Sequence, residues 1–223
     1  AGQLHDVLGQ GKLGITLNLR DEKAKEILAE LVRVSDVVSE NFAKGVLEKW
    51  GFGYDQLKAI KPDIVYAAAS GYAKDGPQRD RPAYDDVIQG EGGFVNLIDR
   101  ANGEARFMPM PATDKLVGYV LASSIGMALF RRERTGKGQE VHVPMLETVL
   151  SFTMVEHLWG ACIGKEDEFG LGYPRMMSPN RRPYPTKDGF VCLLSNTDEQ
   201  WRRMLNAVDL GAVAEDPKFK RLE

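Results

Sequence analysis

Apolar positions along the first third of the chain change their spacing several times, and each change predicts a different element. Residues 12–19 (KLGITLNL) form a run with β character. From residue 21 onward the apolar residues recur at helical spacing, at Ala24, Ile27, Leu28, Leu31 and Val34. Asp21 and Glu22 stand at the start of this pattern, where the positive end of a helix favours negative charge. The pattern therefore predicts a strand and then a helix.

The alternation then repeats on a shorter scale. A brief apolar run at Val37 and Val38 is followed by a short helical segment, Tyr54–Ile60, and Pro62 breaks the pattern. Residues 63–70 (DIVYAAAS) are typical of a buried strand, which stops at Gly71. Strands that alternate with helices over short connections favour an α/β fold built on a parallel sheet.

The strongest helix pattern covers residues 114–134 (DKLVGYVLASSIGMALFRRER) and is apolar nearly all round until its last turn. Its basic last turn suits the negative end of a helix, and Gly136 is a natural stop. We expect this segment to be the most buried helix of the core. A strand over residues 139–143 and a helix from Pro144 to about Trp159 follow.

Composition changes between residues 164 and 185, where glycine, proline, asparagine and arginine dominate, which is typical of a linker. Beyond this stretch we expect a strand over residues 190–194 and a helix over residues 198–208. The predicted organisation is therefore part of a large domain over residues 1–145, a helix and linker over 146–185, and the start of an incomplete small domain over 186–223.

Composition and charge exclude several classes of protein. The net charge is −3 and the basic residues are spread along the chain, so the sequence lacks the basic stripe of a nucleic-acid-binding protein. Two cysteines, Cys162 and Cys192, and three scattered histidines give neither a disulfide framework nor a metal-ligand spacing. We expect two reduced, largely buried thiols, no metal, no membrane segment and a cytoplasmic location.

Familiar catalytic motifs are absent from the sequence. Residues 135–138 (TGKG) lack the spacing of a phosphate-binding P-loop, residues 51–53 (GFG) lack the third glycine of a dinucleotide site, and no G-x-S-x-G elbow is present. Two groups remain as candidate pocket walls because each follows a predicted strand, where parallel sheets bind ligands: Asn41 with Phe42, and Ser70, Gly71 and Tyr72. Plain turn chemistry would also explain them.

Asp114 is the carboxylate in the most unusual position, directly after a stiff apolar stretch (MPMP, residues 108–111) and in the first turn of the long helix. Thr113 or Asp114 could simply cap that helix. Alternatively, a carboxylate in an apolar cleft beside helix N–H donors could attack an activated carbonyl, and the same donors could stabilise the resulting oxyanion. The pattern alone leaves both interpretations open.

Four blocks of residues stand in order along the chain: ENFAKGVL with GFGY (residues 40–54), SGY with GP (70–77), RPAYD (81–85) and RRERTGKGQ (131–139). Together they resemble motifs of the class III CoA-transferases, also called the formyl-CoA transferase or carnitine dehydratase–bile-acid-inducible protein family. The family's nucleophilic aspartate precedes the core helix in a D-x-x-x-G context, which Asp114 and Gly118 match. The resemblance covers nearly all of the chain and favours the nucleophile over the cap.

The resemblance implies roles for further residues. Asp85 matches an acidic position close to the nucleophile, and it completes the expected catalytic pair with Asp114. The positions expected to hold coenzyme A are Lys12, Asn41, Phe42, Lys49, Ser70, Gly71, Tyr72 and Tyr84. The chain departs from the family pattern at Lys44, which replaces a proline, and at Leu13 and Gly14, which replace Arg-Ser.

The family's fold implies a Rossmann-like large domain, a smaller α+β domain and an interlocked homodimer, with this chain as the central part of a longer one. We therefore expect that residues 1–223 alone would not form a stable, active protein. The implied activity moves coenzyme A, a substrate rather than a cofactor, from an acyl-CoA to a carboxylic acid, with no metal or redox cofactor.

Two alternatives remain open at this point. A 2-methylacyl-CoA racemase of the same superfamily would use a histidine where this chain has Tyr84, and a phenol is a poor base near neutral pH. A non-catalytic CoA-binding subunit would have only a structural use for Asp114, and an assay with acetyl- or succinyl-CoA would identify it.

Overall fold

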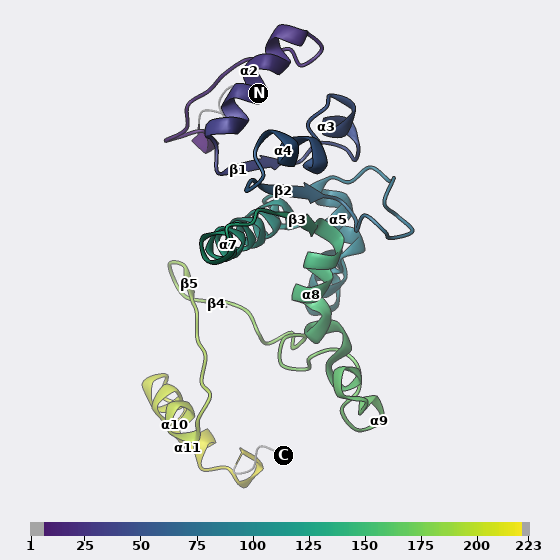
Figure 1. The fold of residues 1–223 in the computed structure, drawn as a ribbon. Helices are drawn as coiled ribbons and strands as arrows, with labels where there is room; N and C mark the ends of the chain where they lie inside the picture. The colour runs from purple at the N-terminus through teal and green to yellow at the C-terminus, as the bar shows by residue number, and fades with distance from the viewer. Residues whose placement is uncertain (1–6, 220–223) are drawn as a thin grey trace. The chain divides into compact units, whose positions relative to one another are not determined.

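The computed structural model describes residues 7–219 and divides the chain into two compact units, Ala1–Tyr173 and Pro174–Glu223. The first unit contains a parallel three-stranded sheet of β1 (Val37–Glu40), β2 (Val65–Ser70) and β3 (Gln139–Pro144) in the order β1-β2-β3 (Figure 1). The α/β class and the parallel sheet predicted from the sequence are therefore confirmed.

The central strand β2 carries the core of this unit. Val65 pairs with Val37 on one side and with Gln139 on the other, so both edges of β2 are hydrogen-bonded. Its first four residues are all buried, because a central strand of a parallel sheet is covered on both faces. This continuous burial explains why residues 63–70 lack alternation in their sequence.

Three helices lie on one face of the sheet: α2 (Glu22–Val34), α3 (Val46–Lys49) and α4 (Tyr54–Ile60). The Asp21 side chain caps α2 by accepting the Lys23 N–H at 2.8 Å. Side chains from this layer and from β2 form one apolar cluster, made of Val32, Leu47, Phe52, Leu57, Ile64, Tyr66 and Ala68. This layer fixes the position of the loop that follows β1.

Further helices of the first unit are α5 (Asp85–Glu91), α6 (Phe94–Asn102), α7 (Ala112–Thr135), α8 (Met145–Leu158) and α9 (Glu166–Phe169), with a 3₁₀ turn at Trp159–Ile163. Helix α7 packs against β2 and β3, and α5 packs against both α7 and α8. A second apolar cluster of Tyr72, Ile88 and Val149 joins the turn after β2 to α5 and α8. These contacts bring the starts of α5 and α7 together.

Helix α7 matches the predicted segment in position but not in burial. Its buried residues are Ala112, Thr113, Val117 and Ala128, out of 24. Tyr119, Met127 and Phe130 are instead 76%, 66% and 63% exposed. The expectation that this segment is the most buried helix of the core was wrong, because the sheet, α5 and α8 leave much of the surface of α7 uncovered within the described residues.

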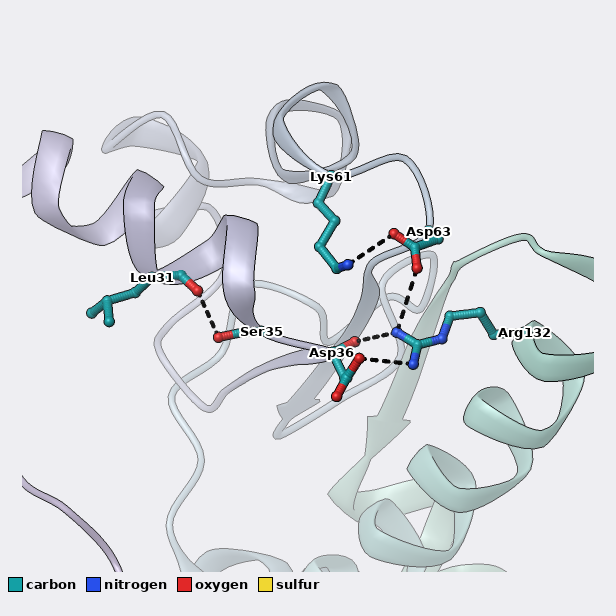
Figure 2. Close-up of polar contacts among 6 residues, drawn as sticks. All are labelled: Leu31, Ser35, Asp36, Lys61, Asp63 and Arg132. Carbon is teal, nitrogen blue, oxygen red and sulfur yellow. Dashed lines mark hydrogen bonds and ion pairs between the residues drawn. The ribbon is translucent and has the colours of Figure 1, made fainter.

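The far end of α7 is held by ion pairs (Figure 2). Arg132 donates to the Asp36 carboxylate at 2.9 Å and to the Asp36 carbonyl at 3.3 Å, and it lies 3.7 Å from the Asp63 carboxylate. Lys61 pairs with the other oxygen of Asp63 at 3.1 Å. Asp36 directly precedes β1 and Asp63 lies just before β2, so the C-terminal turn of α7 is tied to the starts of both strands.

Two further expectations were wrong. Residues 12–19 form no strand, because Leu13 is fully exposed, Ile15 is 64% exposed, and no described strand lies beside them to complete a ladder. Cys162 and Cys192 are free thiols as predicted, but both are exposed rather than buried.

The second unit contains the two-residue strands β4 (Tyr184–Pro185) and β5 (Phe190–Val191), helix α10 (Asp198–Ala207), the short α11 (Gly211–Ala214) and a 3₁₀ turn at Pro217–Phe219. Thr197 and Gln200 form a capping box at the start of α10, because a threonine at the N-cap and a glutamine three residues later have the spacing that this motif requires. Of the strand expected over residues 190–194, only the first two residues, Phe190 and Val191, form a strand. No helix in the described part of the chain is long and apolar enough to cross a membrane.

Candidate active site

Asp85 and Asp114 meet where helices α5 and α7 begin. The Asp85 Oδ1 atom accepts three hydrogen bonds from the start of α7: from the Thr113 backbone N–H at 2.8 Å, the Thr113 hydroxyl at 2.7 Å and the Asp114 backbone N–H at 3.0 Å. Thr113 is fully buried, so its two bonds to Asp85 are shielded from water. The two carboxylates that the resemblance paired are thus neighbours in the structure.

This arrangement decides between the two interpretations of Asp114 as a helix cap or as a free carboxylate. The N-cap residue of α7 is Pro111, whose side chain cannot cap, and Asp85 provides the missing acceptor from another helix. Within residues 7–219, the Asp114 carboxylate takes part in no hydrogen bond or ion pair, and its side chain is exposed. Asp114 therefore does not cap its own helix.

The surroundings shift the two carboxylates in opposite directions. Partial burial, with the charge of Asp85 added, raises the pKa of Asp114 above its ordinary value. Burial also opposes the charged form of Asp85, but donors from Gln89, Thr113 and Asp114 outweigh it and lower the pKa of Asp85. The site therefore combines a less basic Asp85 with a more basic Asp114.

The structure corrects one part of the mechanism inferred from the sequence. Helix N–H donors beside Asp114 were considered as a possible source of oxyanion stabilisation, and the first candidates are the backbone N–H groups of Thr113 and Asp114. Both donate to Asp85 instead, so neither is available to a substrate oxygen. Their effect on the site is to fix the start of α7.

The predicted turn after β2 lies against the segment that leads to Asp85. A Cβ at Gly71 would stand 2.1 Å from the Cβ of Ala83, so only glycine permits this approach. Tyr72 is buried, and its hydroxyl donates to Glu91 at 3.0 Å. Tyr84 is 74% exposed at the N-cap of α5. The turn and Tyr84 are thus brought to the same region, with the Tyr72 ring packed inside the fold.

Ser70 ends β2 with its hydroxyl already engaged. It donates to the Tyr72 carbonyl at 2.8 Å and lies 2.7 Å from Nε2 of His142 on β3. Burial, followed by the charge of Lys74, lowers the pKa of His142, which favours the neutral ring. No pattern in the sequence singled out His142, because only the register of β2 and β3 brings it beside Ser70.

The other predicted CoA positions are distributed around the end of β1. Asn41 and Phe42 follow β1, and the Phe42 ring contacts Trp50 edge-on at 5.5 Å between centroids. Phe42 also lines an apolar cavity of about 180 Å³ together with Leu28, Val32, Leu47 and Phe52. Lys49, at the end of α3, is exposed.

Lys12 stays apart from these groups. Its ammonium donates to the Leu8 carbonyl, and no hydrogen bond or ion pair joins it to the other predicted site residues in the described structure. Residues 7–219 likewise contain no group of three or more His, Cys, Asp and Glu side chains arranged to hold a metal ion.

Gln89 is the residue of this site that sequence reasoning missed. It is fully buried on α5 and bonds Asp85 as well as the stretch that precedes α7. A glutamine in a polar helix (DDVIQGE) is ordinarily expected on the surface. Its spacing of four residues from Asp85 was the available signal, since such residues share a helix face.

Comparison with known proteins shows the family of this chain. The family model described as "CoA-transferase family III" matches residues 2–223. The chain is 31% identical over 213 residues to the succinate–glutarate CoA-transferase of Agrobacterium fabrum, covering 94% of this chain and 52% of that protein. It is 31% identical to the acetyl-CoA:oxalate CoA-transferase of Acetobacter aceti, covering 95% and 54%. The chain belongs to CoA-transferase family III.

Solved structures place the fold in the same group. A CAIB/BAIF family protein from Brucella suis superposes with a TM-score of 0.77 at 31% identity, covering 94% of this chain and 55% of that one. The resemblance recognised in the sequence is therefore confirmed. The chain spans about half the length of the curated relatives it matches.

Proposed function

We propose that the protein transfers coenzyme A from an acyl-CoA to a free carboxylic acid, with Asp114 as the nucleophile. The observation that carries this proposal is the state of Asp114 in a chain of this family. Its carboxylate is exposed, is not used as a cap, and has a raised pKa beside Asp85. An accessible, unpaired carboxylate can attack a thioester carbonyl, and a higher basicity makes its ionised form a stronger nucleophile.

The proposed reaction proceeds through two kinds of intermediate on Asp114. The carboxylate attacks the donor thioester, which expels CoA thiolate and leaves an acyl–aspartyl anhydride. The thiolate then attacks the aspartyl carbonyl, which releases the donor acid and leaves an aspartyl–CoA thioester. The acceptor acid reverses these steps, so that acyl-CoA leaves and the Asp114 carboxylate is regenerated. The thioester bond energy is conserved because no step uses water.

Asp85 would assist by staying ionised and by fixing the segment that carries Asp114. Its three bonds to the start of α7 hold the Asp114 backbone before any substrate arrives, so little reorganisation is needed during attack. Its charge also keeps Asp114 more basic than an ordinary carboxylate.

Coenzyme A would bind along the carboxyl edge of the sheet. Asn41 and Phe42 follow β1 there, the turn at Gly71 follows β2, and the exposed Lys49 offers a cation for a phosphate. Lys12 and Tyr84 would be further contacts of coenzyme A. The working enzyme would need no other cofactor and would be a cytoplasmic, interlocked homodimer.

Oxygen isotope transfer tests the proposal directly. Full-length protein is incubated with a panel of acyl-CoAs and ¹⁸O-labelled acids, and new thioesters are identified by mass spectrometry. Because the acceptor carboxylate attacks the aspartyl thioester, one ¹⁸O atom should enter Asp114 in each turnover. The peptide that contains Asp114 should therefore gain about 2 Da for each ¹⁶O replaced by ¹⁸O, which identifies Asp114 as the group that forms the covalent intermediate.

The Asp114→Asn variant provides the control. It should lose at least about a thousandfold in transfer, retain its fold and CoA binding, and incorporate no label. Turnover within about tenfold of the wild-type rate, or transfer without label in Asp114, would show that another group carries the reaction.

A further inference from the structure

Gln89 uses its whole side-chain amide at the junction of α5 and α7. Its Nε2 donates to Asp85 Oδ2 at 2.6 Å and to the Met110 carbonyl at 3.3 Å. Its Oε1 accepts the Met108 backbone N–H at 2.8 Å. The residue is completely buried, so none of these partners could be replaced readily by solvent.

These bonds join the two parts that determine where Asp114 lies. Met108 and Met110 belong to the stretch that leads into α7, in which Pro109 and Pro111 contribute no N–H donor. Gln89 holds this stretch at two points: its Oε1 accepts from Met108 and its Nε2 donates to Met110. The same amide holds Oδ2 of Asp85 and leaves Oδ1 to the start of α7.

Only an amide fits this set of partners. A carboxylate at position 89 could accept from Met108 but could not donate to Asp85 or Met110 when ionised, and its charge would face that of Asp85. A thioether side chain of similar length could make none of the three bonds. The side chain therefore acts on Asp114 through two connections, the rigid approach to α7 and the orientation of Asp85.

We infer that Gln89 is a positioning residue for the Asp114 nucleophile, which it holds in place through Asp85 and the 108–111 stretch. The inference rests on the proposed function for the role of Asp114. It adds that the chemical step depends on a buried residue that does not touch the substrate. A substitution at position 89 should therefore lower kcat more than it changes KM.

Gln89→Glu in the full-length enzyme gives the sharpest test. The substitution preserves size and the acceptor for Met108, and when protonated the new side chain can still donate to Asp85. We expect transfer by this variant to fall about tenfold or more at alkaline pH, with KM for acyl-CoA within about threefold of wild type. The deficit relative to wild type should shrink as pH falls and the introduced carboxylate takes up a proton.

Gln139→Glu is the matched control, because Gln139 accepts a hydrogen bond from Arg131 at the other end of α7. It should leave kcat and its pH profile unchanged. Gln89→Met, which removes all three bonds, should lower kcat at every pH without the acid-side recovery. Thermal melts of each variant separate loss of fold from loss of position.

A carboxyl ¹³C titration of Asp114, assigned by comparison with Asp114→Asn, reads the same position without turnover. Its midpoint should move in Gln89→Glu and stay in place in Gln139→Glu. If the Asp114 midpoint moves in Gln89→Glu as expected but the wild-type enzyme transfers no CoA, the proposed function is contradicted. The positioning role of Gln89 is still supported in that case. Wild-type kcat in Gln89→Glu at all pH values, or a loss that only follows the unfolded fraction, would overturn the inference.

Discussion

Asp85 accepts the backbone N–H of Asp114 at 3.0 Å, so one carboxylate of the pair holds the segment that carries the other. The bond crosses from helix α5 to helix α7, and a side chain 29 residues earlier supplies the cap that Pro111 cannot. The Asp114 side chain therefore does not cap α7, and its carboxylate is unpaired among the described residues. The consequences of this arrangement, and of the outer parts of the site, can be measured in the full-length enzyme.

The rate of transfer should fall on the acid side at a higher pH than for an ordinary aspartate. Asp114 must be ionised to attack, and its raised pKa means that protonation removes the nucleophile earlier as pH falls. In Asp85→Asn the charge contribution disappears, so the acid limb of kcat/KM should move to lower pH even though the rate itself decreases. The exposed neighbour gives the control: Asp86→Asn should leave the limb in place, and an equal movement in both variants would contradict the assignment.

Lys49→Ala should weaken binding of coenzyme A by about fivefold to tenfold at low salt, because an exposed lysine offers a phosphate a solvent-screened charge. The loss should shrink at high salt and should be absent with a pantetheine analogue that lacks the nucleotide phosphates. Titration calorimetry with both ligands measures it. Lys58→Ala, on the exposed side of α4, is the control. Equal losses for both ligands would show that Lys49 does not contact a phosphate.

The enzyme should not exchange the α-proton of its substrate. Tyr84 stands at the N-cap of α5 where a racemase would need its histidine base, and its side chain is exposed. A 2-methylacyl-CoA incubated in deuterated water should stay unlabelled at the α-carbon over many transfer turnovers, as followed by mass spectrometry. Tyr84→His would reveal whether a base at this position suffices for exchange. Rapid uptake by the wild-type enzyme would favour the racemase alternative.

Arg132→Met should destabilise the fold by about 1–3 kcal/mol, since the substitution keeps the apolar stem and removes charged hydrogen bonds from a side chain that is only 17% exposed. Urea unfolding at constant m-value measures the loss. The pKa of Asp63 is lowered mainly by its hydrogen bond with Lys61, and the charge of Arg132 lowers it further. The stabilisation from this pairing is thus present above the ordinary pKa of aspartate and declines as pH falls through the lowered pKa of Asp63. The difference in unfolding free energy between wild type and Arg132→Met should therefore narrow in acid. Arg134→Met, at an exposed position, should cost far less.

Most of the secondary structure of the first unit was predictable because it depends on local periodicity. The α4 segment was predicted with its observed bounds, Tyr54–Ile60, and α7 begins two residues before the predicted start. The run at residues 12–19 failed because its apolar residues have no partner strand within the described chain. The prediction that α7 is deeply buried failed for a related reason. An apolar sequence indicates that a helix surface favours contact with other apolar groups, but it does not show which part of the fold covers that surface.

The candidate site was predictable only in part. Family motifs singled out Asp85 and Asp114, and the structure places them together. The same motifs could not show which carboxylate caps α7, because that depends on how α5 and α7 pack. Gln89 was missed because only Asp85, four residues away, is linked to it by a local spacing, whereas Met108 and Met110 lie nineteen and twenty-one residues away.

Helix α7 is long enough to separate two kinds of change in an engineered enzyme. Its 24 residues span about 36 Å at about 1.5 Å per residue, several times the screening length of about 8 Å in physiological salt. Substitutions around Arg132 and around Asp85 should therefore act additively. Substitutions at the Arg132 end of α7 could therefore raise thermostability, and substitutions at the Asp85 end could change reactivity, without either set altering the effect of the other.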